Sequence, residues 1–374
     1  MSNILNSNRL IMKIVFYIVI VFSISLIIPI IACTNNHDHN CTPDSLYAEL
    51  LEWKTWAESS SEGLWENNLE YSIILRSDWA IGEDELQPPF YAIESFDVSG
   101  NTLFVADPAS QKLIALREDG TNLWTLGQPG EGPGSFSCIG QIEVGSSLIL
   151  VSNMDNSRID IVSRDGEWLN SISLYQPYDI QFYQDSLIIA ASLSDPDRLI
   201  NILNLDGDLV SSFGSWDDPS GDLPFCNRNL HIALSEDSLL AVSSYYSSYI
   251  QIYDLTTTEL IAGFQRETPL TNVDIEMHSD GETHNFSLPI HHLDVFEGPS
   301  GMLNVLLRPF TTNKEIATSS EEIATIAVID RFNWSGEYLD SYAIPTIAGQ
   351  VIFRDGQLYV SDEMNSTLRC YIIK

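Results

Sequence analysis

Residues 96–136 read FDVSGNTLFVADPASQKLIALREDGTNLWTLGQPGEGPGSF and predict one complete four-stranded antiparallel unit. The turn before the fourth run is Asp119-Gly120, a strong hairpin signal because a type I′ turn needs positive φ at both central residues. A single small sheet cannot bury both of its faces, so this unit must pack against others like itself. The expected strands cover residues 96–98, 103–106, 112–116 and 123–126.

The unit recurs along the chain. Short β-type runs that begin with leucine follow a turn in every repeat, at intervals of 45, 39, 52, 64 and 55 residues. A period near 40–50 residues with four strands per period is typical of a propeller blade. The sequence therefore predicts an all-β fold, a six-bladed β-propeller with four-stranded antiparallel blades, whose second strands start at Leu103, Leu148, Leu187, Leu239, Leu303 and Leu358.

The sixth repeat lacks an outer strand. Residues 351–353, 357–360 and 368–373 supply three strands before the chain ends at Lys374. A β-type run, Leu69–Arg76, is left over before the first blade. We expect this N-terminal strand to close the last blade, because closure removes an exposed sheet edge.

The N-terminus carries an export signal. Arg9 and Lys13 precede an apolar run over residues 14–31, which predicts a signal peptide over 1–33 or, alternatively, an uncleaved membrane anchor. The ending Ile30-Ile31-Ala32-Cys33 resembles the lipobox of bacterial lipoproteins. That resemblance implies acylation of Cys33, cleavage before it and a lipid-anchored protein of the bacterial cell envelope. Thr34 is not a retention signal of the Asp type, which favours the outer membrane.

Three further parts follow the signal. Residues 34–44 are polar and predict a flexible tether. Residues 45–66 predict a short helical lead-in, with an amphipathic helix over Leu46–Ala57. The propeller is expected over 67–374.

The charge of the chain restricts its partners. It has 52 acidic and 17 basic residues, a net charge of −35, and residues 34–374 carry 15 − 52 = −37. Nucleic-acid binding depends on Lys and Arg at phosphates, so we expect no nucleic-acid partner. The charge otherwise indicates a solvated acidic surface or one that attracts basic partners.

The stretch 127–136 follows Val105-Ala106-Asp107 by one hairpin and resembles the inter-blade motif of NHL-repeat proteins. It is similar above all to the lipid-anchored six-bladed propellers of Bacteroidetes-type bacteria. The resemblance implies that the glycines allow close approach of two blades and that Phe136 fills the seam. It implies no single activity, because the family includes metal-dependent lyases, ligand binders and protein-interaction modules.

Long connections are expected to gather on one face, because outer-to-inner connections and second-to-third-strand loops share a face of a propeller. Loops on a rigid scaffold often carry binding sites, although these could also be acid-rich decoration. Trp216, Tyr245 and Tyr246 fall near this face and could stack on a sugar or peptide, or instead seal blades together. The long connections are 80–94, 127–139, 213–229, 265–290 and 309–322.

Histidines near the inner strands raise the possibility of a metal. His231 and His292 could hold a divalent metal in the channel, the one cofactor the sequence suggests. The alternative is that His231 is a core histidine. Oxygen ligands could come from Glu94, Glu143, Asp179 and Asp294.

The sequence contains no nucleophile elbow, phosphate loop, paired-Cys zinc pattern or His-Glu-x-x-His helix. We therefore expect a monomeric, non-enzymatic propeller, held at the membrane by its lipid, that binds an envelope protein, peptide or glycan through the long-loop face. The alternative is a metal-dependent lyase or hydrolase with its site in the central channel.

Overall fold

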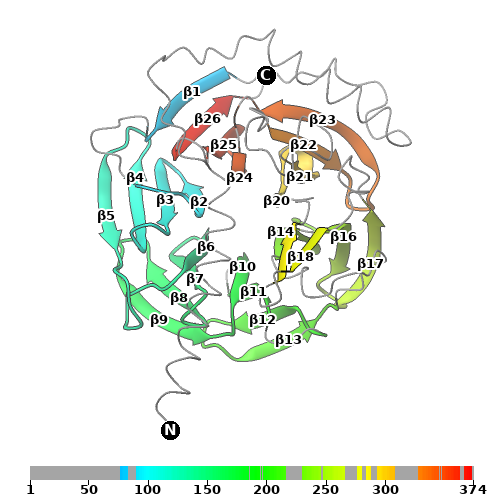
Figure 1. Ribbon diagram of the computed structural model, residues 1–374, viewed down its shortest axis with the longest axis horizontal. Coiled ribbons are helices and arrows are strands. Elements are labelled where there is room, and N and C mark those ends of the chain that lie inside the picture. The colour runs from blue at the N-terminus through cyan, green and yellow to red at the C-terminus, as the bar shows by residue number, and fades with distance from the viewer. Residues whose placement is uncertain are drawn as a thin grey trace.

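The computed structural model contains 26 strands and one short 3-10 helix, η1 (Pro299–Gly301), within the residues it describes. Six four-stranded antiparallel sheets stand in a ring around a central channel (Figure 1). The predicted all-β, six-bladed propeller is confirmed. The residues described are 76–82, 90–184, 186–193, 195, 197–215, 230–245, 247–265, 276–279, 284–287, 293–307, 327–344, 346, 348–362 and 366–372.

Five blades are each built from four strands in chain order, with the first strand at the channel and the fourth at the rim (Figure 1). Blade one matches the predicted unit to within one or two residues at each strand end. The strands of blades one to five are β2 (Ser95–Ser99), β3 (Thr102–Asp107), β4 (Lys112–Arg117), β5 (Asn122–Leu126); β6 (Ile139–Val144), β7 (Leu148–Asn153), β8 (Arg158–Ser163), β9 (Trp168–Ser173); β10 (Pro177–Tyr183), β11 (Leu187–Ser192), β12 (Ile200–Asn204), β13 (Leu209–Phe213); β14 (Leu230–Leu234), β15 (Leu239–Ser244), β16 (Ser247–Asp254), β17 (Glu259–Gln265); and β20 (Asp294–Glu297), β21 (Leu303–Leu307), β22 (Ala327–Phe332), β23 (Tyr338–Ile344).

The sixth blade joins both ends of the propeller. The strands β24 (Ala348–Arg354), β25 (Gln357–Asp362) and β26 (Thr367–Ile372) are completed by β1 (Arg76–Ile81), which pairs antiparallel with β26. Closure by an N-terminal strand is confirmed, but the strand lies downstream of the predicted one and shares only Arg76 with it. Its end is set by Gly82, whose φ of +105° is unfavourable for any residue with a side chain.

The seams between blades contain the core. Phe136 is fully buried between blades one and two, and a Cβ on Gly127 would lie 2.6 Å from its ring. The expected close approach and the expected role of Phe136 are therefore both observed. Phe90 has the same role at the closing seam, where it packs beside Gly82 among residues of blades one and six.

The outer strands share a β-bulge just after the turn that leads into them. In blades one to five the third and fourth strands pair with one extra residue on the outer strand. A bulge twists a free edge away from regular pairing with another strand. The extra residue is an exposed aliphatic each time, with exposed fractions of 38–57%: Leu123, Leu169, Val210, Ile261 and Leu339.

The connection between β17 and β20 contains a two-stranded hairpin, β18 (Glu276–Ser279) with β19 (His284–Ser287). Among the described residues no helix is long and apolar enough to cross a membrane. The predicted signal peptide, tether and lead-in lie outside the described residues, as do Cys33, most of 69–76 and the connection 309–322.

Candidate functional site

The inner strands meet the channel as free sheet edges, and polar side chains occupy these edges. Each inner strand has a polar residue directly followed by an apolar one at the same position of the blade, and we call these six residues the latch residues. In four of the six seams the latch side chain accepts a hydrogen bond from the backbone N–H of the next inner strand, so the blades are linked around the ring. The latch residues are Ser95 (from Ile142, 3.2 Å), Gln141, Asp179 (from Ile232, 2.8 Å), His231, Asp294 (from Val351, 3.1 Å) and Gln350 (from Phe96, 2.9 Å).

Buried carboxylates form the strongest of these links. Asp179 also accepts the N–H of Ile180 at 2.8 Å, and Asp97 accepts the N–H groups of Val98 and Val144 at 2.6 and 2.7 Å. Bonds from backbone N–H to a carboxylate are stronger than neutral ones, which offsets part of the cost of burying the acids. Burial still raises the pKa of Asp179 to about 7. It raises the pKa of Asp294 well above its usual range.

Of the predicted oxygen ligands, Glu143, Asp179 and Asp294 do line the channel, whereas Glu94 is exposed and does not. Asp97 was missed, although it is an acid within an apolar inner strand and carries the same signal as Asp179. The aspartates also have a structural role, because they bind backbone N–H groups of the inner strands, and the local sequence does not predict this role.

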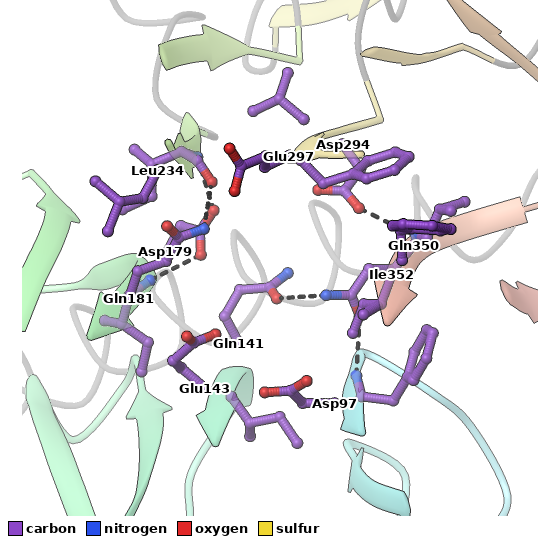
Figure 2. Close-up of a pocket in the computed structure, with 18 of the residues that line it drawn as sticks. Asp97, Gln141, Glu143, Asp179, Gln181, Leu234, Asp294, Glu297, Gln350 and Ile352 are labelled. Atoms are coloured by element: carbon purple, nitrogen blue, oxygen red, sulfur yellow. Dashed lines mark hydrogen bonds between the residues drawn. The ribbon is translucent and has the colours of Figure 1, made fainter. Parts of the chain in front are cut away.

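The channel encloses a cavity of about 230 Å³ (Figure 2). Gln350 donates to Gln141 at 3.4 Å, which links blade six to blade two past the inner strand of blade one. Arg354 is the one basic side chain among the described residues that line this cavity. The carboxyl groups around it come from four blades: Asp97, Glu143, Asp179, Asp294 and Glu297.

Glu143 is half-buried in the cavity and has a strongly perturbed carboxyl group. Burial, and next the charge of Asp97, raise the pKa of Glu143 to about 8, against the opposing charge of Arg354. Burial also raises the pKa of Asp97. Because five acids surround one guanidinium, some of them must hold protons at neutral pH.

Glu143→Gln is expected to flatten the pH dependence of stability. The folded pKa of Glu143 is about 8 and its ordinary value is 4.5, so the stability it contributes is present below pH 4.5 and lost as pH rises through 8. Glutamine stays neutral, so the free energy of unfolding should fall less between about pH 5 and pH 9 than in the wild type. Urea unfolding across this range measures it.

The control for this measurement is Asp119→Asn in an exposed turn. Hydrogen bonds from Thr121 lower the pKa of Asp119, so its titration lies below this range and the slope should not change. Equal slopes for Glu143→Gln and the wild type would contradict the prediction.

His231 occupies the latch position of blade four, but its side chain accepts no hydrogen bond from the next inner strand. The N–H of Val295 that it would bind is already bonded by Asp294. Neither ring nitrogen of His231 has a hydrogen-bond partner in the described structure, and burial lowers its pKa to about 4, so the imidazole is neutral. The ring lies 5.1 Å from that of Tyr245 and does not line the channel cavity.

The structure does not test the predicted metal pair, His231 and His292. His292 lies outside the described residues, and within these no group of three or more His, Cys, Asp or Glu is arranged to hold a metal ion. The pair therefore stays a prediction.

The long-loop face is ordered around Arg158. Its guanidinium donates to the carbonyl oxygens of Glu131 (2.7 Å), Gly132 (2.9 Å) and Ser135 (2.9 Å), and it pairs with Asp160 at 3.0 Å. The glycine-rich connection from β5 to β6 is thus held in one shape, which lowers the entropy cost of using it as a binding surface.

Two exposed tyrosines stand on this face. Tyr91 is 70% exposed before β2 and Tyr175 is 55% exposed before β10, each on an outer-to-inner connection. Sequence reasoning missed both, although each is an aromatic residue just ahead of an inner strand. Of the predicted ligand-face aromatics, Tyr245 is half-buried against His231, while Trp216 and Tyr246 lie outside the described residues.

No known family model matches the sequence, and no curated protein sequence matches it. Solved structures do resemble the fold. A member of the DUF4221 family from Bacteroides vulgatus has a TM-score of 0.54 at 12% identity, over 80% of this chain and 97% of its own.

An inactive virginiamycin B lyase from Staphylococcus aureus, solved with quinupristin, has a TM-score of 0.51 at 12% identity, over 76% of this chain and 95% of its own. At these identities the likeness concerns the fold alone, and what the chain shares with both is the propeller.

Proposed function

We propose that the protein is a lipid-anchored propeller of the bacterial cell envelope that binds a protein, peptide or glycan through its long-loop face. The observation that carries the proposal is the pair of exposed tyrosines on the same face as a connection that Arg158 holds in one shape. Exposed aromatic side chains on a rigid scaffold supply contact area at low entropy cost. We propose further that the protein is an NHL-repeat-like propeller of the Bacteroidetes type, since that type combines a lipid anchor with a six-bladed ring.

Photo-crosslinking in cells tests the ligand face. A photoreactive residue at Tyr91 or Tyr175 is expected to give discrete crosslinked adducts. The same residue at Leu123 or Leu209, which are exposed on outer strands near the opposite face, should give none. Equal crosslinking from both groups of positions would contradict a ligand site on the long-loop face.

The anchor is tested at Cys33. Cys33→Ser should leave an unprocessed precursor that incorporates no labelled fatty acid, because acylation of the thiol precedes cleavage. Cys41→Ser, in the predicted tether, is the matched control and should be processed and labelled normally. Normal processing and labelling of the Cys33 variant would rule out the lipid anchor. An outer-membrane location predicts that the labelled protein fractionates with that membrane.

The second candidate is a metal-dependent lyase or hydrolase in the channel. The cavity and the raised pKa of Glu143 favour it, since perturbed acids gather at reactive sites. Elemental analysis separates the two proposals. One stoichiometric divalent metal that is lost in the His231→Ala, His292→Ala double variant would favour the enzyme.

A further inference from the structure

The channel cavity lies toward the end of the inner strands at which first and second strands are joined, opposite the long-loop face. Arg354 is the last residue of β24 and Glu297 the last residue of β20, and both line it. Gln350 and Gln141, whose side chains are hydrogen-bonded (Figure 2), lie nearer the starts of their inner strands, at the long-loop end of the channel. A second hollow of about 460 Å³ adjoins the cavity and shares Glu143 and Phe182 with it. The cavity is therefore distinct from the proposed ligand face.

Arg354 is the charged side chain of this cavity that has no structural role among the described residues. It is exposed, and it makes no hydrogen bond or ion pair with any described residue. Its charge is nevertheless close enough to act on Asp97, Glu143 and Glu297. A free guanidinium presents a planar set of donors that matches a carboxylate.

The acidic side chains of the cavity can bind a positively charged group. Asp97 and Asp179 each bind two backbone N–H groups, whereas Glu143 is half-buried and accepts one, from Phe182, which leaves its second carboxyl oxygen for a ligand. A protonated amine would find several carboxyl groups within one small space. The volume of about 230 Å³ is below the roughly 300–1,000 Å³ of pockets for drug-sized ligands, so the ligand must be small.

We propose that this cavity binds a small zwitterion, such as a free α-amino acid, with its carboxylate on Arg354 and its amine among Glu143, Glu297 and Asp97. The site uses one face of the ring for a small molecule and leaves the other for the envelope ligand. It neither requires nor contradicts the proposed function.

Binding of the amine should release a proton. At neutral pH Glu143 is largely protonated, and a nearby ammonium would favour its charged form. Affinity should therefore rise as pH increases from about 6 to 8, where the carboxyl group ionises more readily. The charged and titratable groups that face the cavity or its mouth are Asp97, Glu143, Asp179, Asp294, Glu297, Arg354, Arg164, Glu236 and Asp237.

Three probes of similar size test the proposal by titration calorimetry of the whole protein: L-alanine, n-propylamine and propionate. L-Alanine should bind about tenfold tighter than n-propylamine, and propionate should not bind measurably. Repeating the titration in buffers of different ionisation enthalpy should reveal proton release with both amines.

The variants separate the two halves of the site. Arg354→Gln should bring the affinity for L-alanine down to that for n-propylamine, and Glu143→Gln should weaken both amines and abolish proton release. Arg117→Gln and Asp119→Asn are matched charge changes at an exposed turn of blade one and should change nothing. Tyr91 crosslinking should be unaffected by Arg354→Gln, so failure here leaves the proposed function intact.

Three results would overturn the zwitterion site. These are no heat from L-alanine up to about 50 mM, equal affinity for L-alanine and n-propylamine, or unchanged L-alanine binding in Arg354→Gln. Tighter L-alanine binding in Arg354→Gln, the opposite of the expected loss, would identify a simple cation site and is a fourth such result.

Discussion

Deleting residues 34–82 is expected to prevent stable folding, whereas deleting residues 34–44 should leave the melting temperature nearly unchanged. The longer deletion removes β1, which pairs with β26 at five positions from Arg76↔Ile372 to Ile81↔Leu368. Hydrogen bonds of this kind contribute about 1 kcal/mol each, and burial of Ile81 adds roughly 1.5–3 kcal/mol. The sum is comparable to the total stability of about 5–15 kcal/mol of a folded protein.

The loss is larger than these terms suggest, because β26 would become a free edge in an open ring. Thermal unfolding and size-exclusion chromatography of the two deletions measure the effect. A 34–82 deletion that melts like the whole protein would show that the ring does not need β1.

A crosslink tests the register of the same strand pair. Cysteines in place of Ala80 and Arg369, which are direct partners on β1 and β26, should form a disulfide on oxidation. Cysteines in place of Ala80 and Gln357 should not, because Gln357 lies one strand further in. No bond in the first pair would contradict the closure.

Phe136→Ala is expected to lower the free energy of unfolding by about 3–5 kcal/mol. The ring is fully buried in the seam between blades one and two, and its backbone N–H donates to Gln128 at 2.9 Å. Removing it leaves a cavity that the seam cannot close, since β3 and β6 are held at a fixed distance by their own sheets. Urea unfolding measures the loss.

Leu123→Ala is the matched control. Leu123 is an apolar residue of blade one but is 41% exposed as the extra residue of a bulge, so its truncation should change stability by no more than about 0.5 kcal/mol. A Phe136→Ala effect below about 1 kcal/mol would show that the seam is not packed around this ring.

The sequence predicted that an N-terminal strand closes the ring, but not where that strand lies. Residues 69–76 have the β-branched and aliphatic composition of a strand, and the ring needed one strand there. The structure instead uses Trp79-Ala80-Ile81, ended by Gly82, which repeats the Trp124-Thr125-Leu126-Gly127 ending of β5. This repeated ending was the signal that could have located β1, because the glycine marks where an outer strand must stop for its seam phenylalanine to pack.

The sequence by itself determined the blade, its strands and turns, the number of repeats and the need for an N-terminal strand, because these follow from local turn chemistry and a regular period. Only the tertiary structure decided what the channel side chains do. Asp179 and His231 are both polar residues within apolar strands, yet one binds the N–H of Ile232 and the other has no partner in the described structure. That difference depends on the register of the next inner strand, about fifty residues further along the chain, which no local pattern encodes.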